Sequence, residues 1–122
     1  VVSYASSPPA EVVFADPPIE QPPTAAIVAP QTCFRQIEFA GIIKGAKQRD
    51  LAEKWLDFML SVPYQEDLPL NQFVYPVNAQ ARLPEVFAKW SKTATQPANL
   101  APDVIARNRD KWIADWTNIV LK

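Results

Sequence analysis

One segment fixes the predicted fold class: Cys33-Phe34-Arg35-Gln36-Ile37-Glu38-Phe39-Ala40. Apolar and polar residues alternate along it, which is the pattern of a β-strand with one buried face. The side chains that we expect to point inward are Cys33, Ile37 and Phe39, whereas Arg35 breaks the pattern. Because the chain has no His that could activate a thiol, we interpret Cys33 as a small core residue and not as a nucleophile.

The sequence after this strand predicts several helices. Residues 49–61 place apolar side chains on one broad face and charged side chains on the opposite one, as in an amphipathic helix. Shorter helices are expected at 64–67 and 83–90, and a long one runs from Pro102 to the end of the chain. Residues 73–77 (Phe-Val-Tyr-Pro-Val) are β-prone. Short strands together with several helices predict an α/β fold.

The part before the strand is rich in proline. Seven of the 13 prolines lie in the first thirty residues, and proline lacks an N–H and fixes φ, so we expect extended loops over residues 8–30. The apolar runs at 12–14 and 25–29 favour burial of these loops over a free tail. Residues 1–4 (Val-Val-Ser-Tyr) have the composition of a strand interior, and no initiator Met or signal peptide precedes them. We therefore expect a fragment or a processed piece of a longer protein.

Composition argues against several classes of protein. A length of 122 residues allows one modest domain, and a net charge of −1 argues against nucleic-acid binding, which normally requires a basic excess. One Cys and no His leave no internal disulfide, no Cys-rich zinc site and no His-based triad. We therefore expect no enzyme, no metal and no cofactor. Without an apolar run of about 18 residues, no membrane-spanning helix is expected either.

Aromatic side chains near strand ends are the remaining functional signal. Tyr4 precedes the hydroxyl-bearing Ser6 and Ser7, and Phe73 and Tyr75 alternate in the β-prone segment, which would place them on the same side. Such rings can offer a flat face to a planar or cationic ligand, worth about 0.5–2 kcal/mol per cation–π contact. The alternative is that these rings are core residues.

Four segments resemble, in the same order, the thiamine-binding branch of the periplasmic solute receptors of ABC importers. They are residues 3–8 (Ser-Tyr-Ala-Ser-Ser-Pro), 36–40 (Gln-Ile-Glu-Phe-Ala), 50–61 (Asp-Leu-Ala-Glu-Lys-Trp-Leu-Asp-Phe-Met-Leu-Ser) and 73–77. The helical segment resembles many solute receptors, whereas the first and last segments are narrower and favour the thiamine branch. The resemblance covers nearly the whole chain and corresponds to the C-terminal third of such a receptor.

This resemblance implies the C-terminal part of a two-lobed, type II periplasmic-binding-protein fold that closes on its ligand about a hinge. Residues 1–40 would be the end of the second lobe and the hinge strand, with the proline-rich loops at 8–30. Residues 41–122 would be a helical part that packs on the first lobe and the hinge.

The resemblance also implies a binding site. Tyr4 would stack on thiamine or a similar flat cationic solute, Phe73 would cap it with Tyr75 nearby, and the Ser6 or Ser7 hydroxyl would bind its polar edge. Two positions depart from the family: Phe73 stands where Trp is usual, and Pro-Ala-Glu at 9–11 stands where a second Tyr is usual.

The partners and the compartment follow from the same resemblance. It implies a small-molecule ligand, an ABC permease in the membrane, and a periplasmic or extracellular, membrane-associated location. A severed strand edge could also lead to a homodimer by exchange of elements. Two alternatives stay open: a receptor of the same fold for iron(III) or an anion, with Tyr4 as a phenolate ligand, and a proline-rich interaction module.

Overall fold

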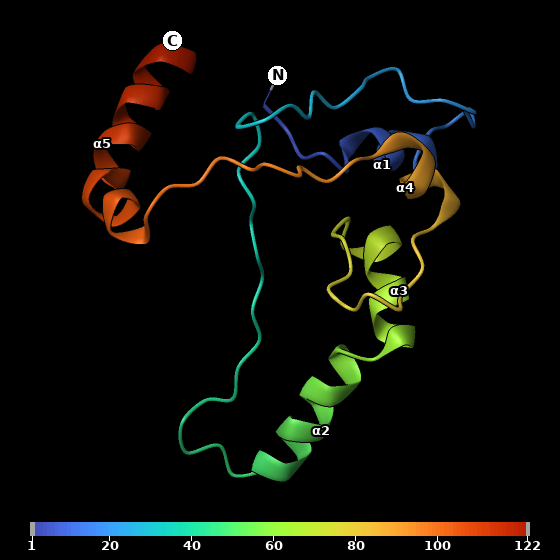
Figure 1. Ribbon diagram of the computed structural model, residues 1–122, viewed down its shortest axis with the longest axis vertical. Helices are drawn as coiled ribbons and strands as arrows, with labels where there is room; N and C mark the ends of the chain where they lie inside the picture. Colours follow the sequence, from blue (N-terminus) through green and yellow to red (C-terminus); the bar gives the residue numbers. More distant parts are fainter. Residues whose placement is uncertain (1, 122) are drawn as a thin grey trace.

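A computed structural model describes residues 2–121 of the chain. Its helices are α1 (Ser7–Val13), α2 (Arg49–Met59), α3 (Val62–Asn71), α4 (Glu85–Trp90) and α5 (Pro102–Val120) (Figure 1). Between residues 2 and 121 there is no β-strand and no sheet, and the one strand-type pairing is an isolated parallel bridge between Phe34 and Ala98. The molecule is therefore helical with long extended connections.

The predicted α/β fold with short strands is wrong for this part of the chain. The segment at 33–40 is extended, but only its first residues form hydrogen bonds with another part of the chain. The Ala98 N–H donates to the Cys33 carbonyl at 2.7 Å, and Arg35 Nη2 donates to the Ala94 carbonyl at 3.1 Å. Phe39, expected inside, is 88% exposed. Alternation alone creates an apolar face, whereas a strand also needs a neighbour that pairs its backbone groups.

The other two predicted strand segments are not strands either. Residues 2–4 and 73–77 have no ladder partner in the structure, and Val1 lies outside the described residues. The short strands of a type II periplasmic-binding-protein fold are thus missing from residues 2–121.

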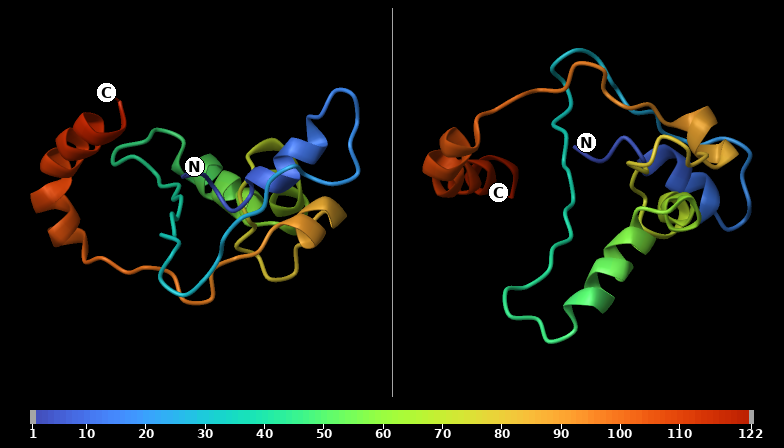
Figure 2. Two further views of the ribbon diagram at one scale, coloured as in Figure 1. Left: turned by 90° about the horizontal axis from the view of Figure 1, so that it is seen from above. Right: turned by 60° about the horizontal axis from the view of Figure 1, so that its bottom comes forward.

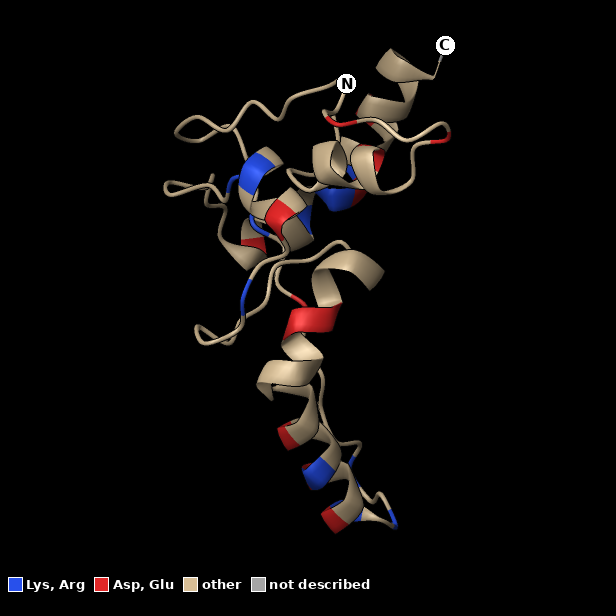
Figure 3. Ribbon diagram, turned by 90° about the vertical axis from the view of Figure 1, so that its right-hand side faces the viewer, with Lys and Arg blue, Asp and Glu red and all other residues tan. Residues whose placement is uncertain are grey.

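The amphipathic helix predicted at 49–61 is confirmed as α2. Asp50 lies in its first turn, where the helix dipole favours an acid, and Figure 3 shows acidic and basic residues spaced along this helix. The apolar side of α2 meets α3, where the rings of Trp55, Phe58 and Tyr64 lie 5.4–6.3 Å apart in tilted and edge-on contacts. The α3 helix begins with a proline in its first turn, where a missing N–H breaks no hydrogen bond.

A helix that the sequence analysis did not predict, α1, lies in the proline-rich part. Pro8 and Pro9 occupy its first turn, where proline is tolerated because the first N–H groups of a helix have no partner within it. Both prolines are buried, and α1 packs against α4. The predicted portions 1–40 and 41–122 meet at this contact, which Figure 2 shows from two sides.

A small core forms where α1, α3 and α4 approach one another. Phe87 of α4 is 0% exposed, and Pro9 and Pro69 are also fully buried. Two polar side chains join them, since Ser6 is 5% and Gln65 is 4% exposed. The core is therefore built from a few side chains that lie far apart in the sequence.

The long C-terminal helix predicted from Pro102 is confirmed as α5. Its polar side carries the i,i+4 ion pairs Asp103–Arg107 and Lys111–Asp115. An extended connection at 91–101 leads to it, and α5 lies apart from the other helices in Figures 1 and 2. Of the helices between residues 2 and 121, none combines the length and the apolar character needed to cross a bilayer.

Candidate functional site

Three of the predicted site residues lie at the N-terminal end of α1. The Tyr4 ring is 69% exposed and has no aromatic neighbour among residues 2–121. The Ser7 N–H donates to the Tyr4 carbonyl at 3.0 Å, and the hydroxyls of Ser7 and Ser3 are hydrogen-bonded at 2.7 Å. Ser6 is only 5% exposed. The structure thus places a free ring face beside a hydroxyl pair, and places Ser6 in the core.

Phe73 lies just after α3 and is tied to the other end of α1. Its φ of 57° falls in the left-handed region, which few residues other than glycine adopt. Its ring packs on Phe14, with the centroids 5.3 Å apart and the planes tilted by 56°. Phe14 is itself 67% exposed, so the two rings form an aromatic surface. The structure does not bring Phe73 into ring contact with Tyr4, which stands before the start of α1.

Phe14 was not among the predicted site residues. The apolar run at 12–14, which it ends, was expected to be buried. An aromatic residue at the end of this run is a possible signal of an aromatic surface. Its contact with Phe73 could not be predicted, because the two residues lie far apart in the sequence.

Gln65 in α3 holds the segment that carries Phe73 and Tyr75. The buried Gln65 amide donates from Nε2 to the Met59 carbonyl at 2.7 Å, and its Oε1 accepts the N–H of Val77 at 2.7 Å and of Asn78 at 3.4 Å. Gln65 was not among the predicted site residues, because a polar residue in a helix of mixed polarity has no periodicity that marks it as buried. One side chain therefore joins the end of α2 to the segment at 73–78.

Tyr75 is placed against the core. Its ring packs edge-on against Phe87, with the centroids 6.1 Å apart and an interplanar angle of 83°. Its hydroxyl is buried and finds no hydrogen-bond partner within residues 2–121. The nearby Ser91 hydroxyl donates to the Phe87 carbonyl at 2.7 Å instead. Burial raises the pKa of Tyr75 above its ordinary value of 10.0, and the Ser91 hydroxyl offsets part of that rise.

Replacing this hydroxyl should change stability at alkaline pH. Because the folded pKa of Tyr75 is raised, the neutral hydroxyl favours the fold below pH 10.0, and this contribution is lost as the pH rises through the folded pKa. We expect the Tm of Tyr75→Phe relative to wild type to be higher at about pH 11 than at about pH 8. Thermal unfolding followed by circular dichroism measures both. A Tm difference that stays constant between these pH values would contradict the assignment.

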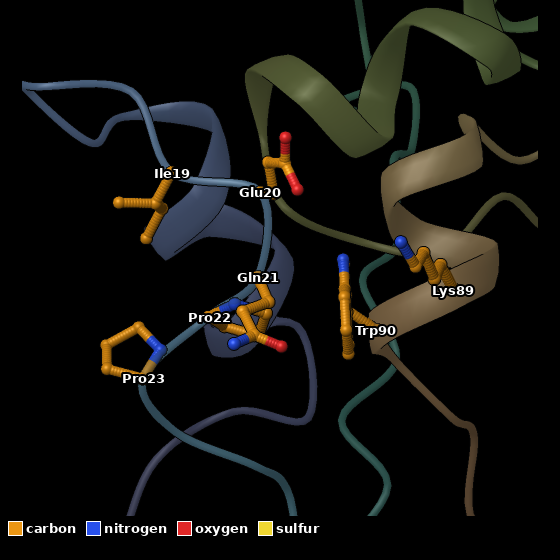
Figure 4. Close-up of a pocket in the computed structure, with 7 residues that line it drawn as sticks. All are labelled: Ile19, Glu20, Gln21, Pro22, Pro23, Lys89 and Trp90. Atoms are coloured by element: carbon orange, nitrogen blue, oxygen red, sulfur yellow. The ribbon is translucent and has the colours of Figure 1, made fainter.

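A separate hollow lies between the proline-rich loop and the end of α4 (Figure 4). Its volume is about 700 Å³, and it is lined by Ile19, Glu20, Gln21, Pro22, Pro23, Lys89 and Trp90. Lys89 Nζ lies 4.7 Å from the centroid of the Trp90 ring, a cation–π distance. None of the five predicted site residues lines this hollow.

Within the described part of the chain, no three His, Cys, Asp or Glu side chains gather closely enough to hold a metal ion. What α1 and the segment at 73–77 offer is aromatic surface and hydroxyl groups, which suit the binding of a flat molecule.

The comparisons with known proteins confirm the resemblance predicted from the sequence. The chain is 37% identical over 87 residues to the thiamine-binding periplasmic protein of Escherichia coli (strain K12), a match that covers 71% of this chain and 26% of that protein. The Brucella suis biovar 1 (strain 1330) protein of the same name is 29% identical over 121 residues, or 95% of this chain and 34% of that protein.

The matches lie in the C-terminal portion of these relatives. The chain thus spans about a quarter to a third of their length. No family model matches, and no solved structure matches.

Proposed function

We propose that this chain is part of a solute-binding receptor of an ABC importer, and that the receptor binds thiamine or a similar flat cationic solute without transforming it. The proposal is supported by relatives from two genera that are named thiamine-binding periplasmic protein. The observation on the molecule that carries it is Tyr4, a ring 69% exposed next to surface hydroxyls. An exposed tyrosine ring face attracts a cation and stacks on a planar ring.

In the proposed site, Tyr4 stacks on the ring of the solute and Ser7 binds its polar edge. Phe73 adds a second aromatic surface together with Phe14, at the other end of α1. Ser6 and Tyr75 support these contacts from the core, since the buried Ser6 caps the start of α1 and Tyr75 packs on Phe87. Recognition then rests on ring faces and hydroxyls, and no bond is made or broken.

The proposal includes partners and a compartment. A receptor of this kind works in the periplasm or at the outer face of the cell, where it meets a membrane permease, and this contact would be its association with the membrane. The extended segment from 36 to 42 makes no backbone hydrogen bonds, so two copies could exchange elements along it. These partners follow from the proposed receptor role.

Substituting Tyr4 tests the stacking contact. We expect Tyr4→Ala to weaken the binding of thiamine by about 2- to 30-fold in Kd, which corresponds to the 0.5–2 kcal/mol of a cation–π contact. Isothermal titration of the full chain with thiamine measures the effect. Phe39→Ala is the matched control, because Phe39 is also an exposed ring, at 88%, and has no place in the proposed site; its Kd should equal that of the wild type.

Two results would overturn this proposal. No heat with thiamine or related flat cations would remove the ligand class, and equal losses in Tyr4→Ala and Phe39→Ala would remove the site. A visible charge-transfer band on adding ferric salt, lost in Tyr4→Phe, would instead favour an iron(III) receptor with a tyrosinate ligand.

A further inference from the structure

We propose that Phe14 is a positioning residue of the solute site: its ring, carried at the end of α1, fixes the ring of Phe73, which contacts the solute. This inference rests on the proposed function, because it takes Phe73 as a residue that faces the solute. It adds a claim of its own, namely that Phe14 acts on solute binding through Phe73 and not by direct contact.

Phe73 occupies a backbone position that favours glycine. The α3 helix ends at Asn71, and its capping residue Gln72 donates its N–H to the Leu68 carbonyl at 2.8 Å. Phe73 follows directly, with a φ of 57°. The residue at this point past a helix end is usually glycine, because a Cβ atom is unfavourable in the left-handed region. Phe73 is therefore strained, and such strain persists only where surrounding contacts hold it.

Contacts on both the backbone and the side chain hold Phe73 in this conformation. Beyond it in the chain, Gln65 Oε1 accepts the N–H of Val77 at 2.7 Å and of Asn78 at 3.4 Å, which fixes the course of the segment. Among residues 2–121, the ring of Phe73 packs on that of Phe14, at 5.3 Å between centroids, and on no other aromatic ring. The contact with Phe14 is therefore the one that sets the direction of the Phe73 ring.

Phe14 is itself placed by a packed helix. Its N–H donates to the Ala10 carbonyl at 3.0 Å, which caps the end of α1. This helix packs against α4, and its residues Pro8 and Pro9 are buried. Phe14 thus belongs to a fixed element, whereas Phe73 is the strained residue. The direction of the effect follows, because the fixed ring positions the strained one.

The same helix carries the other part of the proposed site. Tyr4 and Ser7 lie at its N-terminal end, where the Ser7 N–H donates to the Tyr4 carbonyl at 3.0 Å. Phe14 lies at its C-terminal end. The contact between Phe14 and Phe73 therefore ties the second aromatic surface to the helix that carries the first.

Isothermal titration of the full chain with thiamine tests the role of Phe14. We expect Phe14→Ala to weaken binding by about 2- to 10-fold in Kd, the range that corresponds to the loss of one aromatic pair contact. Phe73→Ala should weaken binding at least as much. Adding Phe14→Ala to Phe73→Ala should change the Kd no further, because the ring to be positioned is already gone. Phe14→Tyr keeps the ring and should bind as the wild type does.

Phe34→Ala is the matched control, because Phe34 is 60% exposed against 67% for Phe14 and lies outside the proposed site; its Kd should equal that of the wild type. A wild-type Kd in Phe14→Ala or in Phe73→Ala would overturn this inference alone. A further loss on adding Phe14→Ala to Phe73→Ala would also overturn it, since Phe14 would then contact the solute directly. No heat with the wild-type chain would overturn the proposed function, and this inference with it.

Urea unfolding followed by circular dichroism tests the contact without any solute. Phe73→Gly relieves the backbone strain but removes the ring that packs on Phe14. The resulting shift of the urea midpoint should be more stabilising in a Phe14→Ala background than in the wild type, because there the contact is already lost. Equal shifts in the two backgrounds would overturn the inference. The same spectra show whether Phe14→Ala keeps its helices, so that a loss of binding is not mistaken for a loss of fold.

Discussion

Phe87→Ala is expected to lower the free energy of unfolding by about 3–5 kcal/mol, the range measured for large-to-small changes of buried Phe. Phe87 is 0% exposed, and its ring meets that of Tyr75 at 6.1 Å. It sits on α4, the helix that packs against α1, so removing it leaves a cavity where these two helices meet. Urea unfolding followed by far-UV circular dichroism measures the change.

The size of this effect depends on how little else the core contains. Other fully buried side chains are Pro9 and Pro69, and neither can move to fill the space of a phenyl ring. Phe39→Ala provides the control, since the same atoms are removed from a ring that is 88% exposed; its effect should stay within about 0.5 kcal/mol. A loss in Phe87→Ala no greater than in Phe39→Ala would contradict the core described above.

The helices α2 and α5 could be predicted from sequence because their signals are local. The amphipathic pattern of α2 and the proline at the start of α5 lie within the elements that they specify. The ends of both helices differ from the prediction by no more than two residues. The prediction of α1 failed because proline density was taken as evidence for loops, although Pro8 and Pro9 occupy the one turn of a helix that accepts proline.

The strand at 33–40 could not be judged from its own sequence. Its alternation describes how side chains would be distributed if the backbone were paired. Whether the pairing exists depends on other parts of the chain, and in residues 2–121 only the bridge from Phe34 to Ala98 is present. Ile37 and Phe39, expected inside, are therefore 56% and 88% exposed.

The candidate site shows the same division between local and distant signals. That Tyr4 stands beside hydroxyl groups was readable from residues 3–8. The contact of Phe73 with Phe14 was not, because it depends on how α1 and α3 come together. The alternation of Phe73 and Tyr75 was also misleading: the positive φ of Phe73 breaks the extended pattern, and the two rings pack on different partners.

Gln65→Met is expected to destabilise the fold by about 1–3 kcal/mol, because methionine has a volume similar to that of glutamine but makes none of its hydrogen bonds. The Met59 carbonyl and the Val77 N–H would each lose a partner at 2.7 Å. A backbone group left without a partner costs about 1–3 kcal/mol where it is buried, and less where water can reach it, as at Val77, which is 70% exposed. Urea unfolding gives the total, and amide hydrogen exchange at Val77 should quicken more than exchange within α5.

The control for this change is Gln36→Met, at an exposed glutamine in the extended segment, where the effect should stay within about 0.5 kcal/mol. The comparison matters for the site, because Gln65 links the end of α2 to the segment that carries Phe73 and Tyr75. If the stability loss in Gln65→Met equals that in Gln36→Met, or exchange at Val77 is unchanged, the segment at 73–78 is held by other contacts. If both respond as expected, a single buried amide positions this aromatic segment against α1 and α4.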